Sequence, residues 1–248
     1  MRTAAIIQAR MGSVRLPGKV LLPLAGRPVL AHVIERVRAC TLVHEVVVAT
    51  TDRPRDGVVV ELARSLGVRT HRGNDEDVLS RVYHAARGAE VIVRVTADCP
   101  LFDPGLLERM LVRFHARHAA GDAVDYLSNT VVRTYPRGLD AEIVTFEVLQ
   151  QAHREAADPF EREHVTPYIY CHPERFRIES FTGDRDLSHL RWTLDTDEDY
   201  HSLAEIHAAL RAEAAPFDMQ AVLDLLGRRP ELVHTEERPA SSRSCAVK

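Results

Sequence analysis

Residues 8–19, with the sequence QARMGSVRLPGK, combine three cationic side chains with two glycines. They follow a short apolar run, residues 4–7, which is typical of a strand in a buried sheet. Glycine lets backbone amides turn towards a ligand, and Arg10, Arg15 and Lys19 supply the positive charge that a polyphosphate attracts. Like charges this close together repel one another unless an anion binds them. The segment therefore predicts a binding loop for a nucleoside triphosphate, and an ordinary loop with solvated cations is the alternative.

This loop differs from a Walker P-loop in two ways. Five residues separate Gly12 from Gly18, one more than that motif allows, and Val20 follows Lys19. A P-loop carries a serine or threonine after its lysine, and that hydroxyl binds magnesium. Any metal that this protein uses must therefore be bound by residues outside the loop.

Asp98 is the first candidate ligand for such a metal, because nucleotidyl transfer needs a divalent cation to neutralise the phosphates. An aspartate at this kind of position often caps a helix instead. Here Asp103 is the better cap, since Pro104 follows it at the position that proline favours in the first helical turn. Asp98 is thus left without a capping role.

The same test applies to Asp195, the second candidate. Thr196 can cap the following helix, with Asp199 three residues later as its partner in a capping-box arrangement. Asp195 is again left over. Two spare carboxylates at the ends of strands would repel each other without a cation between them, so the pair predicts a metal site.

The first half of the chain alternates apolar runs of strand type with amphipathic helical stretches. Predicted strands cover residues 3–8, 45–50, 68–71 and 90–96, and predicted helices cover about 28–38, 55–66, 74–87 and 103–119. This order indicates right-handed strand–helix–strand units and a parallel sheet. Ligands of such sheets bind at the carboxyl ends of the strands, where the 8–19 loop, residues 50–52 and Asp98 all fall.

The pattern changes after about residue 124. Short strand-like runs at 124–127, 141–146 and 176–181 are interrupted by a helix near 146–156 and by the segment 161–170. We interpret about residues 129–190 as a small mixed α+β extension that lies over the sheet. Helices at about 197–212 and 218–226 complete a single domain, residues 1–228, and residues 229–248 form a polar, flexible tail. The predicted fold class is α/β, with a Rossmann-like, mostly parallel sheet between layers of helices.

The composition narrows the class of protein. The chain has 248 residues, of which 45% are apolar, and its formal net charge is −4. This charge argues against a nucleic-acid-binding protein that relies on a basic surface. No apolar stretch approaches the length of a membrane span, and the N-terminus lacks the features of a signal peptide, so we expect no membrane partner and a cytoplasmic location. The four cysteines are scattered without a C-x-x-C motif, which argues against a zinc knuckle.

The 8–19 loop resembles the nucleotide signature of cytidylyltransferases of the 3-deoxy-manno-octulosonate and acylneuraminate type. It is most similar to the branch of spore-coat polysaccharide biosynthesis proteins. The similarity continues through further blocks in order: VVVATTD (46–52), RGNDEDVLSR (72–81), VRVTADCPLFDP (93–104), YPRGLDAEI (135–143), DPFEREHVTPYIY (158–170) and TLDTDEDY (193–200). An ordered series of blocks is more specific than any single motif.

The resemblance implies a fold of the nucleotide-diphospho-sugar transferase type. It also implies transfer of CMP from CTP to a small-molecule acceptor, either a sugar acid, a phosphorylated compound or a phosphonate, with release of pyrophosphate. Asp98 and Asp195 would hold Mg²⁺, or Mn²⁺ in its place, and Lys19, Arg10 and Arg15 would act on the phosphates. The predicted nucleotide-binding residues are Gln8, Ala9, Arg10, Met11, Gly12, Ser13, Lys19, Thr50, Thr51, Asp52, Arg72, Gly73 and Ala97.

The acceptor site is expected in the extension, in segments that resemble the substrate region of the family. Its predicted residues are Arg137, Glu142, Arg162, His164 and Tyr168. Arginine forks suit a carboxylate or a phosphate. His164 is either a base for an acceptor hydroxyl or a structural histidine. The family also implies a homodimer formed through this extension.

Three residues of the block 72–81 have structural interpretations. We expect Asn74 to cap the helix that follows, with Asp77 as its partner. We expect Arg81, inside the same helix, to form an ion pair rather than to bind a ligand.

Two other functions are compatible with the motifs. One is a transferase that uses another nucleoside triphosphate, of the sugar-1-phosphate or molybdopterin type, although those enzymes favour loops with more glycines and fewer cations. The other is a catalytically inactive nucleotide-binding scaffold. The joint presence of Lys19, Asp98 and Asp195 argues against the scaffold, because an inactive protein does not need all three.

Overall fold

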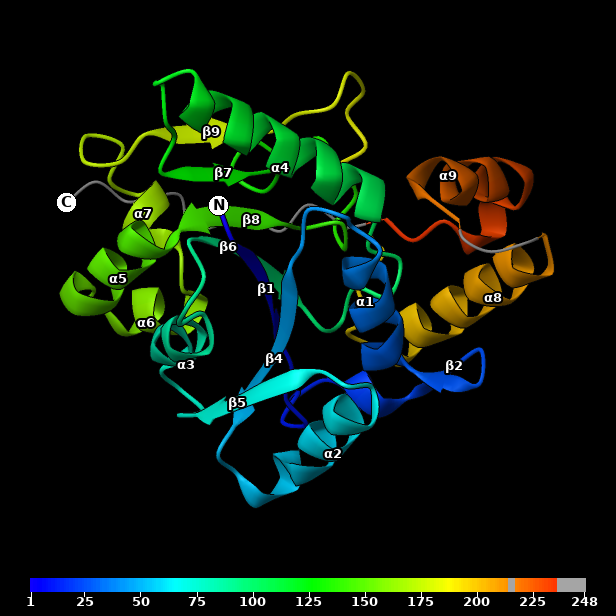
Figure 1. The fold of residues 1–248 in the computed structure, drawn as a ribbon. Coiled ribbons are helices and arrows are strands. Elements are labelled where there is room, and N and C mark those ends of the chain that lie inside the picture. Colours follow the sequence, from blue (N-terminus) through cyan, green and yellow to red (C-terminus); the bar gives the residue numbers. More distant parts are fainter. Residues whose placement is uncertain (214–216, 236–248) are drawn as a thin grey trace.

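A central sheet of seven strands organises the computed structural model, which describes residues 1–213 and 217–235 (Figure 1). The strand order is β5-β4-β1-β6-β8-β7-β9. The strands are β1 (Thr3–Gln8), β4 (Glu45–Thr51), β5 (Arg69–Gly73), β6 (Val91–Thr96), β7 (Tyr126–Ser128), β8 (Glu142–Thr145) and β9 (Ile178–Ser180). Strands β5, β4, β1 and β6 are parallel, as the alternation of strands and helices predicts. A separate two-stranded ribbon joins β2 (Pro23–Leu24) to β3 (Arg27–Pro28).

Helices cover both faces of the sheet (Figure 1). One face carries α1 (Val29–Arg38), α2 (Gly57–Ser65), α4 (Pro104–Ala119), α8 (Asp197–Glu213) and α9 (Met219–Arg228). The other carries α3 (Val78–Ala85), α5 (Phe146–Glu155) and α7 (Pro167–Tyr170), and α6 (Pro159–His164) packs on α3. Side chains of β1 alternate between the two cores, with Ala5 and Ile7 in one and Ala4 and Ile6 in the other. Among the described helices, none is long and apolar enough to cross a bilayer.

Local capping explains where several helices begin. Asp103 Oδ1 accepts a hydrogen bond from the Leu106 amide at 2.6 Å, so its predicted capping role at α4 is confirmed. Thr196 and Asp199 exchange side-chain-to-amide bonds of 3.2 and 2.9 Å at the start of α8, which is the predicted capping box.

The expected cap of the helix at 74–87 was wrong. The helix α3 begins four residues later than expected, at Val78, and Asp77 caps it by accepting from the Ser80 amide at 2.9 Å. Asn74 Oδ1 instead accepts from the amides of Glu76 and Asp77 at 2.8 and 2.9 Å. An asparagine side chain that bonds to the backbone two residues ahead makes a turn, and this turn delays the helix.

The extension is part of the sheet rather than a layer over it. Strand β8 pairs antiparallel with β6, and β7 and β9 continue the sheet beyond it. The start of the predicted tail is also packed on the fold. Pro230–Leu232 forms a short 3-10 helix, Leu232 is buried, and Arg191 donates its amide to the His234 carbonyl at 2.9 Å. Residues 236–248 of the predicted tail lie outside the described residues.

Strand β1 marks the point where the direction of strand addition changes. The chain goes from β1 to β4 and β5 on one side and then returns to β6 on the other. Gln8 and Thr96 stand opposite each other at the ends of β1 and β6, and the Ala97 amide still donates to the Gln8 carbonyl at 2.9 Å. Connections that leave in opposite directions open a crevice at the carboxyl ends of such strands.

A buried pair of histidines should make this fold sensitive to acid. His32 of α1 and His207 of α8 lie with ring centroids 4.4 Å apart, and both are buried. Burial, followed by the nearby His32 and Arg36, lowers the pKa of His207 to about 3. The folded state therefore resists protonation that the unfolded chain accepts below about pH 6.5. The free energy of unfolding should fall as the pH drops from about 6.5 to about 3, by up to about 1.4 kcal/mol per pH unit from this group.

Urea denaturation at several pH values measures this effect. His207→Leu should flatten the decline between pH 6.5 and pH 4.5 relative to the unaltered protein. His201→Gln, an exposed histidine of the same helix, should leave it unchanged. Equal slopes for His207→Leu and the unaltered protein would contradict the assignment.

Candidate active site

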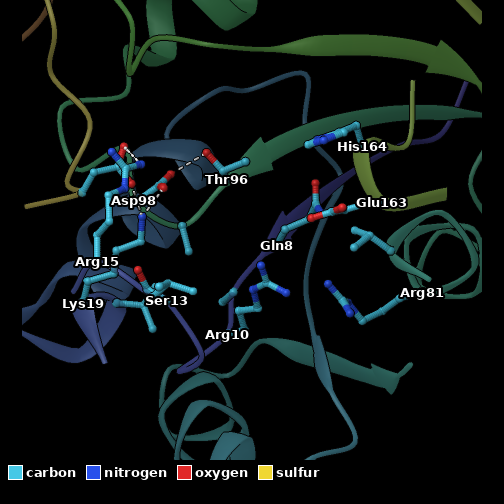
Figure 2. Close-up of a pocket in the computed structure, with 16 residues that line it drawn as sticks. Gln8, Arg10, Ser13, Arg15, Lys19, Arg81, Thr96, Asp98, Glu163 and His164 are labelled. Carbon is cyan, nitrogen blue, oxygen red and sulfur yellow. Dashed lines mark hydrogen bonds and ion pairs between the residues drawn. The ribbon is translucent and has the colours of Figure 1, made fainter. Parts of the chain in front are cut away.

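A cavity of about 350 Å³ opens where the loops after β1 and β6 diverge (Figure 2). Its wall comes from the 8–20 segment, the end of β6, the start of α3, the end of α6 and the residue before the α8 cap. The lining residues are Gln8, Ala9, Arg10, Ser13, Val14, Arg15, Lys19, Val20, Val78, Arg81, Thr96, Ala97, Asp98, Glu163, His164 and Asp195.

Lys19 joins the two predicted metal ligands. The loop before it turns at Gly18, whose φ of 75° is a left-handed conformation that glycine tolerates, and the Gly18 amide donates to the Met11 carbonyl at 2.9 Å. This turn delivers the Lys19 ammonium to Asp98 Oδ2 at 2.6 Å and Asp195 Oδ1 at 2.8 Å (Figure 2). Lys19 is only 9% exposed, so its cation is held by the two carboxylates rather than by water.

The opposite charges of Lys19 and Asp195 each favour the charged form of the other. Burial alone would raise the pKa of Asp195, but hydrogen bonding and attraction from Lys19, together with Arg15 at 3.0 Å and Arg191 at 2.8 Å, lower it below its usual value. Burial would likewise lower the pKa of Lys19, but Asp98 and Asp195 raise it. Asp195 and Lys19 are therefore both charged at neutral pH, and the site offers anionic oxygen ligands and a cation side by side.

The start of α8 fixes the position of Asp195. Asp199 Oδ2 accepts the amide of Asp195 at 2.8 Å, while it also caps the helix through Thr196. Arg191 donates to Asp199 Oδ2 at 3.1 Å and to Asp195 Oδ2 at 2.8 Å. Asp199, which was assigned only a capping role, thus also orients the Asp195 backbone. Arg191 was not predicted, although its spacing of four residues from Asp195 could have indicated the pair.

Two further aspartates contact the first part of the 8–19 loop. Asp56 is fully buried, accepts the Met11 amide at 2.6 Å and bonds the Thr51 hydroxyl. Asp75 pairs with Arg10 at 3.2 Å and lies 3.5 and 3.7 Å from Arg53 and Arg55. Sequence reasoning missed both. Asp56 follows closely after β4, so the strand-end argument applied to Asp98 could have identified it.

The predicted nucleotide residues divide into two groups. Gln8, Ala9, Arg10, Ser13, Lys19 and Ala97 line the cavity, and so do the predicted catalytic Arg15 and the predicted metal ligands. Met11, Gly12, Thr50, Thr51, Asp52, Arg72 and Gly73 do not line it, and their part in nucleotide binding stays a prediction. Thr50 and Thr51 are fully buried. Arg72 donates to the carbonyls of Thr51 and Arg53 at 3.1 and 2.9 Å, which braces the adjoining loop.

Of the predicted acceptor residues, His164 alone lines the cavity, beside Glu163, which was not predicted. Glu142 is buried in an ion pair with Arg94, and it accepts from Tyr126 Oη at 2.6 Å and Thr166 Oγ1 at 2.5 Å. These contacts give Glu142 a structural role in joining β8 to its neighbours. An acceptor role for it stays untested.

The other three acceptor candidates also make structural contacts. Arg162 forms a bidentate pair with Asp77 at 3.0 and 2.5 Å, which ties α6 to the start of α3. Tyr168 donates its hydroxyl to Glu155 at 2.6 Å. The backbone of Arg137 bonds to Leu190 and Trp192 at 3.0 and 2.7 Å. Acceptor roles for these residues stay predictions.

Arg81, for which we expected a structural role, lies at the cavity instead. It was expected to form an ion pair, but its described hydrogen bonds go to the backbone carbonyls of Asn74 and Asp75, and its side chain lines the cavity. Arg81 lies in the first turn of α3, where the carbonyls of Asn74 and Asp75 take the place of a carboxylate partner.

The donor set fits a divalent cation shared with a nucleotide. Asp98 and Asp195 converge on one ammonium group, so their oxygens face a common point. Within residues 1–213 and 217–235, no cluster of three or more acidic, histidine or cysteine side chains could hold a metal alone. Mg²⁺ commonly takes one or two carboxylates and completes its shell with phosphate oxygens and water.

The mostly parallel sheet and the cavity at the ends of β1 and β6 define a Rossmann-like nucleotidyltransferase. A family model described as cytidylyltransferase matches residues 4–223. The chain belongs to this cytidylyltransferase family.

Three known proteins show the extent of the similarity. The spore coat polysaccharide biosynthesis protein SpsF of Bacillus subtilis (strain 168) is 33% identical, over 94% of this chain and 97% of its own. A cytidylyltransferase structure from Leptospira borgpetersenii superposes with a TM-score of 0.87 at 33% identity, over 94% of this chain and 97% of that one. A CMP:2-keto-3-deoxy-manno-octonic acid synthetase complexed with CTP gives a TM-score of 0.60 at 21% identity, over 86% and 100%, which supports the fold alone.

Proposed function

We propose that this protein transfers CMP from CTP to a small acceptor in a reaction that depends on a divalent metal. The observation that carries this proposal is the meeting of Lys19, Asp98 and Asp195 beneath a loop that bears Arg10 and Arg15. A cationic loop suits a triphosphate, and a carboxylate pair suits the metal that accompanies it.

In the proposed reaction, an oxygen of the acceptor attacks the α-phosphorus of CTP in line. The new oxygen–phosphorus bond forms as the bond from the α-phosphorus to its bridging oxygen breaks, and pyrophosphate leaves with that oxygen. Lys19, Arg10 and Arg15 stabilise the charge that develops on the phosphates. Where the acceptor oxygen is a hydroxyl, its proton passes to His164, whose ring lines the cavity.

Asp98 and Asp195 would hold Mg²⁺, or Mn²⁺, which supplies further neutralisation of phosphate charge when bound. Lys19 then has to release at least part of its contact with the two carboxylates, and the triphosphate offers its ammonium new partners. The acceptor is proposed to be a sugar acid, a phosphorylated compound or a phosphonate. A homodimer formed through the extension stays a prediction.

Thermal unfolding with each of CTP, ATP, GTP and UTP, with and without Mg²⁺, tests the proposal. A ligand at a hundred times its dissociation constant adds about 2.7 kcal/mol, which raises the midpoint of a chain this size by roughly 5–10 °C. We expect this rise with CTP and Mg²⁺. A rise with another nucleotide alone would favour a transferase of the sugar-1-phosphate or molybdopterin type. No rise with any nucleotide would contradict the proposal.

A further inference from the structure

A turn of the extension lies against the segment of chain that leads to Asp195. The Arg137 amide donates to the Leu190 carbonyl at 3.0 Å, and the Arg137 carbonyl accepts from the Trp192 amide at 2.7 Å. These two bonds make a parallel bridge between Arg137 and Arg191. The turn therefore fixes the backbone on both sides of Arg191, whose side chain donates to Asp195 at 2.8 Å.

Gly138, the residue after Arg137, allows this close approach. Its φ of 108° is a backbone conformation that residues with a side chain rarely adopt. A Cβ atom added to Gly138 would lie 2.7 Å from the carbonyl carbon and oxygen of Trp192 and 3.0 Å from the Thr193 nitrogen. These are backbone atoms, so they cannot give way without moving the chain around them. A side chain at this position would therefore push the turn and the segment around Trp192 apart.

The other side of the same segment is bonded to the proposed metal and phosphate groups. The Leu194 amide donates to the Asp98 carbonyl at 2.9 Å, and the Leu194 carbonyl accepts from Lys19 Nζ at 2.8 Å. Asp195 follows directly, and its Oδ1 atom also accepts from Lys19 at 2.8 Å. Residues 190–195 thus lie between the turn and Asp98. Because Leu194 is fully buried, a shift of this segment would displace Asp195 relative to Asp98.

We propose that Gly138 is a positioning residue for the metal site. Because it has no side chain, the turn can hold residues 190–195 where the Asp195 carboxylate lies close to that of Asp98. This inference rests on the proposed function, in which these two carboxylates hold Mg²⁺. Groups that orient metal ligands are worth about tenfold to a hundredfold in metal affinity. Gly138 should therefore affect the joint binding of Mg²⁺ and CTP far more than the binding of CTP alone.

The alternative is a glycine that stabilises the fold without influencing the metal site. Its substitution would then lower the unfolding midpoint and leave the effect of Mg²⁺ on CTP binding unchanged. The geometry favours the positioning role, because the atoms that meet the added Cβ belong to the same short segment as Asp195. Leu194 joins them to the site, since its backbone bonds to both Asp98 and Lys19.

Calorimetry of CTP binding to the full chain, with and without Mg²⁺, tests the inference through Gly138→Ala. We expect the enhancement of CTP binding by Mg²⁺ to fall by about tenfold or more, while binding without metal stays within about threefold of the unaltered protein. Trp192 is the sole tryptophan of the chain, so a change in its fluorescence should report the displacement directly. A Mg²⁺ enhancement equal to that of the unaltered protein would overturn the inference.

Gly88→Ala is the matched control. Gly88 also has a left-handed φ, of 92°, but a Cβ added there meets no atom of the described chain within 4 Å beyond its immediate neighbours. The control thus introduces the backbone strain without the collision. It should lower the unfolding midpoint and keep the Mg²⁺ enhancement of the unaltered protein. A matching loss of enhancement in this control would overturn the inference, because strain outside the site would then suffice.

Hydrogen exchange of the unaltered protein provides the test if Gly138→Ala does not fold. Because coupling between two sites is reciprocal, Mg²⁺ with CTP should slow exchange of the Trp192 amide, which bonds to Arg137, about tenfold more than CTP alone does. The Asp125 amide, which donates to the Arg177 carbonyl at 2.9 Å, should show no such difference. Equal protection of the Trp192 amide with and without Mg²⁺ would contradict the coupling.

The outcomes separate this inference from the proposed function. If Mg²⁺ does not strengthen CTP binding to the unaltered protein, the proposed metal dependence fails and the inference fails with it. If Mg²⁺ strengthens binding equally in the unaltered protein and in Gly138→Ala, the inference alone is overturned. An equal loss of CTP binding with and without metal would also overturn it, since the turn would then support the whole nucleotide site.

Discussion

Asp98→Asn should reduce nucleotidyl transfer by at least about a thousandfold while leaving the fold intact. The substitution keeps the shape of the side chain and its bond with Thr96, whose hydroxyl lies 2.6 Å from Asp98 Oδ1. It removes the charge that Lys19 contacts at 2.6 Å and that the metal would need. Pyrophosphate release from CTP measures the loss once acceptors are screened, and the Mg²⁺-dependent part of the thermal shift with CTP should disappear.

Two comparisons make this result specific. CTP without metal should still stabilise Asp98→Asn, because the cationic loop is unchanged. Asp122→Asn, which removes an exposed carboxylate that pairs with Arg117 and does not line the cavity, should behave like the unaltered protein. Near-normal turnover in Asp98→Asn would show that the metal is held elsewhere.

Lys19→Ala should lose turnover by about a hundred- to a thousandfold, as expected when a group that stabilises developing charge is removed. It should also lower the unfolding midpoint in the absence of metal, because Asp98 and Asp195 lose the cation that they share. Mg²⁺ alone should then stabilise this variant more than it stabilises the unaltered protein, since metal ion replaces the missing ammonium. Thermal unfolding across a Mg²⁺ titration measures this second effect.

Arg15→Ala gives a graded comparison for the Lys19 result. Its side chain is 61% exposed and contacts Asp195 at 3.0 Å, so water screens its charge and the stability effect should be small. A variant at Lys19 whose midpoint is unchanged and whose response to Mg²⁺ matches the unaltered protein would contradict the shared-cation interpretation.

Local sequence signals predicted most elements and the caps of α4 and α8, because capping depends on neighbours within a few residues, but they misplaced the cap of α3. Asp103 and Thr196 were assigned correctly as caps, and this freed Asp98 and Asp195 for the site where the structure brings them together. The strand predicted at residues 3–8 has the bounds of β1, because a buried apolar run that is followed by a glycine-containing loop has clear limits.

What the sequence could not supply was the direction of each side chain. Thr51 and Glu142 lie in segments near the site, but their side chains bond to Asp56 and Arg94 instead of lining the cavity. Direction in a strand reverses with every residue, so it depends on a register set by distant partners. Arg81 shows the converse, because it was expected to form an ion pair, yet it bonds the Asn74 carbonyl and its side chain lines the cavity.

The chain order of Lys19, Asp98 and Asp195 has a consequence for folding. The lysine is 79 residues from one of its carboxylate partners and 176 from the other. Contacts between such distant segments close large loops, and their entropic cost makes them late events in folding. The parallel strands of the N-terminal half can pair before the segment around Asp195 arrives. Recovery of nucleotide binding during refolding should therefore lag behind recovery of the helical circular dichroism signal. Nucleotide should stabilise the chain only after these distant segments have come together.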